Sequence, residues 1–221
     1  MLDWQAVKLS LELAFCSSFI LLVIGLPLAY WLSKSKRKWK FLIEAAVALP
    51  IILPPTVLGF YILYFTGPHG TFGKALESLG VHALPFTFMG ILFGSVLYNL
   101  PFAVRPFIAG FSSVDTRLVE ASKSLGVSNL GTFFRTEIPL AWGGILTGFI
   151  LSFAHTIGEF GVVLMVGGSI PGVTRTLSIS IYDDVQSLNY AAANVSACVL
   201  LVFAYLILSG LSLLQKKGLP I

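Results

Sequence analysis

Long uncharged apolar stretches constrain this chain more than any other feature of its sequence. Residues 13–33 contain no charged side chain and would rise about 32 Å as a helix, enough for the roughly 30 Å hydrocarbon layer of a bilayer. Similar stretches occupy most of the 221 residues, and only 11% of the side chains are charged, where a soluble domain carries about 25%. The sequence therefore predicts a polytopic membrane protein and excludes an ordinary water-soluble domain.

The apolar stretches predict an all-α protein with about five transmembrane helices, in a single domain over residues 1–221. The second span contains three prolines. Each proline removes a backbone N–H from the helix, and lipid cannot supply the hydrogen bond that is lost. We therefore expect this span to be kinked, lined by protein and close to a pathway. The expected spans lie at residues 11–33, 42–66, 86–106, 138–168 and 188–214, with a cytoplasmic polar loop at 107–137.

The basic residues indicate how the chain is oriented in the membrane. Eleven of the 14 lysines and arginines fall in connections that this topology places in the cytoplasm, and Lys8, Lys74 and Arg175 fall outside. The positive-inside rule therefore predicts an external N-terminus and a cytoplasmic C-terminus in the cell membrane. Since the cations flank apolar stretches instead of forming one solvated face, we expect contact with membrane lipid and not with nucleic acid.

The sequence offers no pattern typical of an enzyme, a cofactor site or a metal site. Gly73-Lys74-Ala75 follows Gly67 in a superficially phosphate-loop-like order, but the glycine spacing is one residue too long and Ala75 replaces the required Ser or Thr. The three histidines are scattered without a metal-ligand spacing. We therefore expect a non-enzymatic protein without a cofactor or a bound metal.

The polar loop contains a short helix with the features of a docking element. Asp115 is a candidate N-cap, small residues follow Glu120, and Gly126 offers a helix stop. Such a helix ends abruptly and can seat shallowly in a groove on another protein. A loop helix that merely joins two spans is the alternative, but the cap, the stop, the cytoplasmic location and the proline thirteen residues after Gly126 favour docking.

This loop resembles the EAA loop of ABC-importer permeases at Glu120, Ala121, Gly126 and Pro139. It departs from that loop at Ser122, which replaces a second alanine, and at Thr136 and Ile138. The resemblance implies a type I ABC-importer permease fold and a coupling helix that binds a separate homodimeric ATPase. The ATPase-coupling residues implied are Glu120, Ala121, Ser122, Leu125, Gly126 and Pro139.

Two further segments look like the molybdate-type permeases in particular. They are Leu49-Pro50-x2-Leu53-Pro54-Pro55-x-Val57-x-Gly59 and Gly158-Glu159-Phe160-Gly161. The resemblance implies a permease that pairs with a second copy of itself and receives molybdate from an extracytoplasmic oxyanion-binding protein. Tungstate and sulfate are alternative cargoes, and a secondary transporter or a channel is a less favoured alternative because few ionisable residues lie mid-span.

Glu159 and His155 are the two ionisable side chains placed mid-span, four residues apart on one helix. An intramembrane carboxylate is costly without a partner, so we expect the two to pair. Because a carboxylate binds a dianion poorly, we assign Glu159 to helix packing or gating. Arg105 either attracts an exiting anion or extends toward lipid phosphates. The expected pathway or gating residues are Pro50, Pro54, Pro55, Gly59, Arg105, His155, Gly158, Glu159 and Gly161.

Glycines at positions 144 and 148, in the fourth expected span, have the small-residue spacing that lets two helices approach closely. We interpret this pair as a packing feature.

Overall fold

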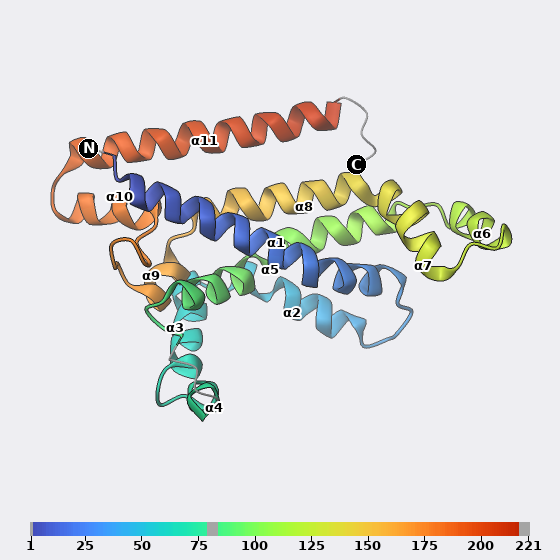
Figure 1. Cartoon of the computed structure of the whole chain (residues 1–221), viewed down its shortest axis with the longest axis horizontal. Helices are drawn as coiled ribbons and strands as arrows, with labels where there is room; N and C mark the ends of the chain where they lie inside the picture. Colours follow the sequence, from blue (N-terminus) through green and yellow to red (C-terminus); the bar gives the residue numbers. More distant parts are fainter. Residues whose placement is uncertain (1, 79–83, 217–221) are drawn as a thin grey trace.

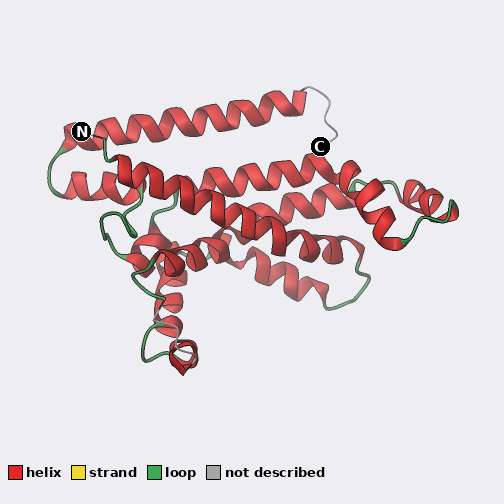
Figure 2. Cartoon of the chain, viewed as in Figure 1, coloured by secondary structure: helices red, strands yellow, loops and turns green. Residues whose placement is uncertain are grey.

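The computed structural model describes residues 2–78 and 84–216, and these residues form helices and loops without a β-strand (Figures 1 and 2). The predicted all-α fold is thereby confirmed. Four helical segments are long and apolar enough to cross a membrane, or five when one bent pair is counted as a span. In chain order the helices are α1 (Trp4–Lys34), α2 (Lys40–Ile52), α3 (Pro55–Thr66), α4 (Thr71–Ser78), α5 (Phe88–Ser112), α6 (Thr116–Ser124), α7 (Asn129–Thr132), the π-helical segment η1 (Phe133–Glu137), α8 (Ile138–Gly158), α9 (Gly161–Gly167), α10 (Leu177–Gln186) and α11 (Tyr190–Lys216).

The stretch expected as a kinked second span consists of two helices that point in different directions. The axis of α2 and that of the segment Pro55–Ala75 differ by 111°. Pro54 disfavours helical geometry at the residue before it, Leu53, which is extended. Pro55 begins α3, and at this first position a backbone N–H would make no hydrogen bond within the helix, so proline is tolerated there. As a result α2 runs along the bundle while α3 crosses it (Figure 1).

The stretch expected as a fourth span is also interrupted. A helical run extends from Asn129 through η1 to Gly158. Glu159 then adopts an extended conformation and Phe160 precedes the short helix α9. The chain therefore contains two breaks within apolar stretches, one between α2 and α3 and one between α8 and α9.

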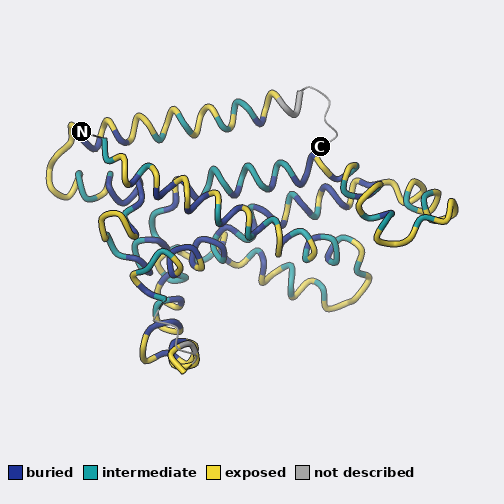
Figure 3. The backbone as a smooth tube through the Cα atoms, in the orientation of Figure 1, coloured by how far each residue is buried: buried dark blue, intermediate teal, exposed yellow. Residues whose placement is uncertain are grey.

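Helices α1, α5 and α8 pack side by side and form the core (Figure 1). Their buried side chains include Leu13, Leu21, Phe107, Phe111 and Ile145. In contrast, only 17% of the most apolar window of α11 is buried, and this helix is largely exposed along its length (Figure 3). An apolar helix with so little protein contact is suited to a lipid environment.

Glycines allow α5 and α8 to approach closely. A Cβ atom placed on Gly144 would lie 2.6 Å from the Cα atom of Gly110 and 2.6 Å from the carbonyl oxygen of Pro106. A Cβ atom on Gly148 would lie 2.5 Å from the ring of Phe107. The glycine pair in α8 is therefore a packing feature, as the sequence indicates.

Gly144→Ala is expected to destabilise the protein by about 1–3 kcal/mol, because the added methyl group meets backbone atoms of α5 that cannot rotate away. Thermal unfolding of the purified protein in detergent measures this change. Gly210→Ala in α11 is the matched control, since a Cβ atom there meets nothing within 4 Å. Equal unfolding temperatures for the two variants would contradict the close α5–α8 contact.

Candidate functional site

A buried polar cluster lies where α8 ends, and Asn99 of α5 holds it together. The Nδ2 atom of Asn99 donates hydrogen bonds to Oε2 of Glu159 at 2.9 Å and to the carbonyl oxygen of Ser95 at 2.8 Å. Its Oδ1 atom lies 2.8 Å from Nδ1 of His155. Because an amide oxygen can only accept, Nδ1 of His155 donates in this pair. Asn99 is 0% exposed and Glu159 is 3% exposed.

This arrangement changes the expected pairing of His155 with Glu159. Within the described part of the chain the two side chains make no direct hydrogen bond, and each binds Asn99 instead. Sequence reasoning missed Asn99, although an amide inside an otherwise apolar stretch is an available signal. The ring of His155 also stacks on Phe102, with 3.9 Å between ring centroids. The cluster thus joins α5 to the end of α8.

A cavity of about 550 Å³ lies beside this cluster. Elements α3, α5, α8 and α9 surround it, and its lining residues are Pro55, Thr56, Tyr98, Ala154, His155, Gly158, Glu159, Phe160 and Gly161. Five residues predicted for the pathway or gate therefore meet at one cavity. The second carboxylate oxygen of Glu159, Oε1, is buried and has no hydrogen-bond partner among the residues that the structure describes.

Gly59, and Gly161 in addition to lining the cavity, act through packing, and the other predicted pathway residues lie elsewhere. A Cβ atom on Gly59 would lie 2.6 Å from the Cβ atom of Met165, and one on Gly161 would lie 2.7 Å from the Cβ atom of Pro55. These two glycines let α3 contact α9. Pro50 and Pro54 belong to the region of the α2–α3 break, and Arg105 is exposed on α5. Pro50, Pro54 and Arg105 do not line the cavity.

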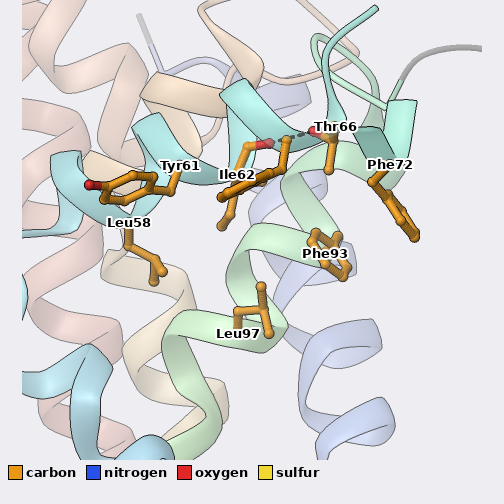
Figure 4. A pocket seen from close by; sticks show the side chains of 8 residues that line it. Leu58, Tyr61, Ile62, Thr66, Phe72, Phe93 and Leu97 are labelled. Atoms are coloured by element: carbon orange, nitrogen blue, oxygen red, sulfur yellow. Dashed lines mark hydrogen bonds between the residues drawn. The ribbon is translucent and has the colours of Figure 1, made fainter. Parts of the chain in front are cut away.

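A second cavity, of about 300 Å³, lies between α3, α4 and α5 and has an apolar surface (Figure 4). Two lining residues, Tyr61 and Thr66, carry a hydroxyl, and that of Thr66 donates to the carbonyl oxygen of Ile62 on the same helix at 2.7 Å. The cavity surface is apolar and none of the described residues that line it is charged, so we do not assign it to the functional site. Its lining residues are Leu58, Tyr61, Ile62, Phe65, Thr66, Phe72, Phe93 and Leu97.

The polar loop forms a projecting helix, α6, at one end of the bundle (Figure 1). Asp115 caps α6 by accepting a hydrogen bond from the Arg117 N–H at 2.9 Å, as predicted. Gly126 follows with a φ of +81°, a conformation that favours glycine, and turns the chain away. No residue of α6 is buried, and Leu125 next to it is 85% exposed. The α6 helix and Leu125 are thus open to the surroundings of the protein.

The other predicted coupling residues surround or anchor this helix. Glu120 and Ala121 are exposed on α6, and Pro139 is exposed at the start of α8. Ser122 faces inward, with its hydroxyl 3.3 Å from those of Thr132 and Thr136. Glu137, which sequence reasoning counted only among the loop charges, is buried just before α8.

Across residues 2–78 and 84–216, no three His, Cys, Asp or Glu side chains are grouped as metal ligands would be.

Asn99→Leu is expected to lower the free energy of unfolding by about 3 kcal/mol or more, because it leaves His155 and buried Glu159 without their shared partner. Thermal unfolding in detergent measures the loss. Asn194→Leu provides the control, since Asn194 is exposed on α11. If both variants unfold at the wild-type temperature, Asn99 does not hold the cluster.

Comparison with solved structures supports the fold. A bacterial ABC transporter that imports the acidic polysaccharide alginate superposes with a TM-score of 0.76 over 97% of this chain and 79% of that chain, at 16% identity. The MetNI methionine ABC transporter superposes with a TM-score of 0.73 over 98% of this chain and 95% of that chain, at 19% identity.

Sequence relatives match over nearly the whole chain. The molybdenum transport system permease protein ModB of Azotobacter vinelandii is 46% identical over 95% of this chain and 92% of its own length. A putative molybdenum transport system permease protein of Bacillus subtilis, YvgM, is 33% identical over 96% of this chain and 92% of its own length. A probable sulfate transport system permease protein of Chlorella vulgaris, cysT, is 29% identical over 90% of this chain and 75% of its own length.

The family described as the binding-protein-dependent transport system inner membrane component matches residues 22–217. This match spans most of the chain, and the relatives and the fold agree with it. ATPase and extracytoplasmic binding-protein partners are implied by membership of this family. The chain therefore belongs to the family of multi-pass inner-membrane permease subunits of binding-protein-dependent ABC importers.

Proposed function

We propose that this chain is the permease subunit of an ATP-driven importer of molybdate. The observation that carries the proposal is the 46% identity to the Azotobacter vinelandii molybdenum permease over nearly the full length of both chains. The putative Bacillus subtilis molybdenum permease supports the same cargo. The sulfate permease relative is less similar, so sulfate is the second candidate, and tungstate is a third because its size is close to that of molybdate.

In the proposed assembly, two copies of the chain form a pathway at their interface, and an external binding protein delivers the oxyanion. The N-terminus lies outside and the C-terminus in the cytoplasm. Eleven of 14 cations on the cytoplasmic side support this orientation. One of the eleven, Lys217, lies outside the described residues. The projecting loop around α6 then faces the cytoplasm and binds one subunit of a homodimeric ATPase.

The cavity beside Glu159 belongs to the pathway in this proposal. In the described chain no lysine or arginine lines it, so oxyanion selectivity resides mainly in the binding protein. The hydrogen bond from Asn99 to Glu159 holds the α8–α9 break against α5. In this proposal the break is a gate that opens when α8 and α5 separate. Gly158 and Gly161 flank this break, and Pro55 contacts it from α3.

The proposed cargo is tested by ATP hydrolysis in vesicles that contain this chain, its ATPase and its binding protein. Molybdate-loaded binding protein is expected to stimulate hydrolysis severalfold more than sulfate-loaded binding protein, because only the cognate loaded protein favours the closed ATPase dimer. If only sulfate-loaded binding protein stimulates hydrolysis, the cargo is sulfate and not molybdate. Uptake without any ATPase bound would instead support a secondary transporter or a channel.

Leu125→Ser is expected to weaken binding of the ATPase about tenfold or more while leaving the unfolding temperature unchanged. The side chain is 85% exposed, so its loss costs the fold little, whereas burying a leucine side chain against a partner contributes about 1.5–3 kcal/mol to binding. Co-purification and affinity measurements with the ATPase test this. Leu188→Ser is the matched control, because Leu188 is 73% exposed beyond α10, outside the α6 loop. Equal affinities for both variants would contradict docking at Leu125.

A further inference from the structure

Glu137 is a buried carboxylate that two side chains of α1 hold. It is the last residue of η1 and is 2% exposed. Its Oε1 atom lies 2.7 Å from Nζ of Lys34, and its Oε2 atom accepts a hydrogen bond from the Tyr30 hydroxyl at 2.8 Å. Both carboxylate oxygens are therefore satisfied, as a buried charge requires. We call Tyr30, Lys34 and Glu137 the Glu137 joint.

Aromatic rings enclose the joint. The ring of Tyr30 packs edge-on against Phe111 of α5, with 5.2 Å between centroids, and against Phe133 of η1, at 4.8 Å. Such contacts fix the position of the Tyr30 hydroxyl and keep water from one side of the ion pair. The joint consequently fastens the cytoplasmic end of α1 to η1 in one defined geometry.

The same π-helical segment is fastened to the projecting loop. The Thr136 hydroxyl donates to Ser122 of α6 at 3.3 Å, and Thr136 directly precedes Glu137. The helical run then continues from η1 into α8 without interruption. Single π-helical turns occur frequently at functional sites. Contacts therefore connect α6 to η1 through Ser122, and η1 to α1 through Glu137.

Helix α1 extends from this joint to the opposite end of the bundle. There the Ser10 hydroxyl oxygen accepts a hydrogen bond from the Leu177 N–H at the start of α10, at 2.8 Å. Between these two contacts α1 packs against α5 and α8. Helix α1 thus links the Glu137 joint to the contact with α10 at the other end of the bundle.

From these contacts we propose that Glu137 is a positioning residue for energy coupling, which transmits movement of the ATPase-bound α6 loop to α1. This proposal rests on the proposed function of the chain as an ABC-importer permease. Glu137 contacts neither cargo nor nucleotide in it and acts through Lys34 and Tyr30.

The location of the pair favours coupling over simple stabilisation. Replacing a buried ion pair by apolar residues is often neutral or stabilising, so the pair of buried Glu137 with Lys34, whose side chain is 34% exposed, is weak support for a purely structural role. The ion pairs Lys8–Glu12 and Lys40–Glu44 each lie within one helix and are partly exposed. The Glu137 joint instead connects two elements distant in sequence, one of which carries the docking loop.

The test compares Glu137→Gln with wild type in vesicles that contain the full complex with ATPase and binding protein. Oxyanion uptake and ATP hydrolysis are measured in the same sample, with whichever oxyanion stimulates the wild-type complex. The ATP hydrolysed per oxyanion transported is expected to rise about fivefold or more, the lower range of typical coupling between sites. Affinity for the ATPase is expected to stay unchanged, because the exposed docking surface is untouched.

Two further variants separate coupling from structure. The charge swap Lys34→Glu with Glu137→Lys restores an ion pair and is expected to bring the ratio back toward wild type. Glu44→Gln breaks the exposed pair with Lys40 and is the matched control, with an unchanged ratio expected.

A wild-type ratio in Glu137→Gln, with or without a lower unfolding temperature, would overturn the proposal and leave the joint a structural contact. If Glu137→Gln does not assemble, Tyr30→Phe decides, because it removes one hydrogen bond and keeps the ion pair. A raised ratio in Tyr30→Phe supports the joint and a wild-type ratio refutes it. Since the cargo is chosen from the wild-type assay, failure of the molybdate assignment leaves this comparison intact.

Discussion

Lipid supplies no hydrogen-bond partner, and this constraint underlies the arrangement of the whole chain. Polar groups within the apolar stretches depend on protein partners, and Asn99 is that partner for His155 and for the Oε2 atom of Glu159. The same requirement applies to the backbone at the two helix breaks. Both breaks are covered by neighbouring helices, since α3 packs on α9 and α5 packs on both α8 and α9. Irregular backbone is thus concentrated at one protein-lined place, where the larger cavity also lies.

The described chain combines a tightly packed helical core with an exposed loop. Helices α1, α5 and α8 form a core in which glycine contacts bring backbones together, and such a core resists gradual deformation. The α6 loop buries none of its own helix and depends on Ser122 and on the helical run below it for its position. If the ATPase binds this loop as proposed, a local movement of the loop would act on a core that moves as whole helices.

Features set by neighbouring residues could be predicted from the sequence, whereas contacts between distant segments could not. Apolar length and flanking charge predicted the membrane helices, and Asp115 and Gly126 predicted both ends of the short loop helix. Asn99 binds Glu159 across 60 positions and Tyr30 binds Glu137 across 107, so their roles depend on how the helices pack. Likewise, prolines predict a kink in the second span, but its 111° angle depends on contacts between α3 and α9.

The exposure of the α6 loop has a consequence for quality control in the cell. A segment with few buried contacts opens at low free-energy cost, so in an unassembled permease this loop would be accessible to proteases on its side of the membrane. A bound ATPase would cover the loop and stabilise it by mass action. Assembly would then also determine lifetime, with orphan permeases removed and complete importers retained.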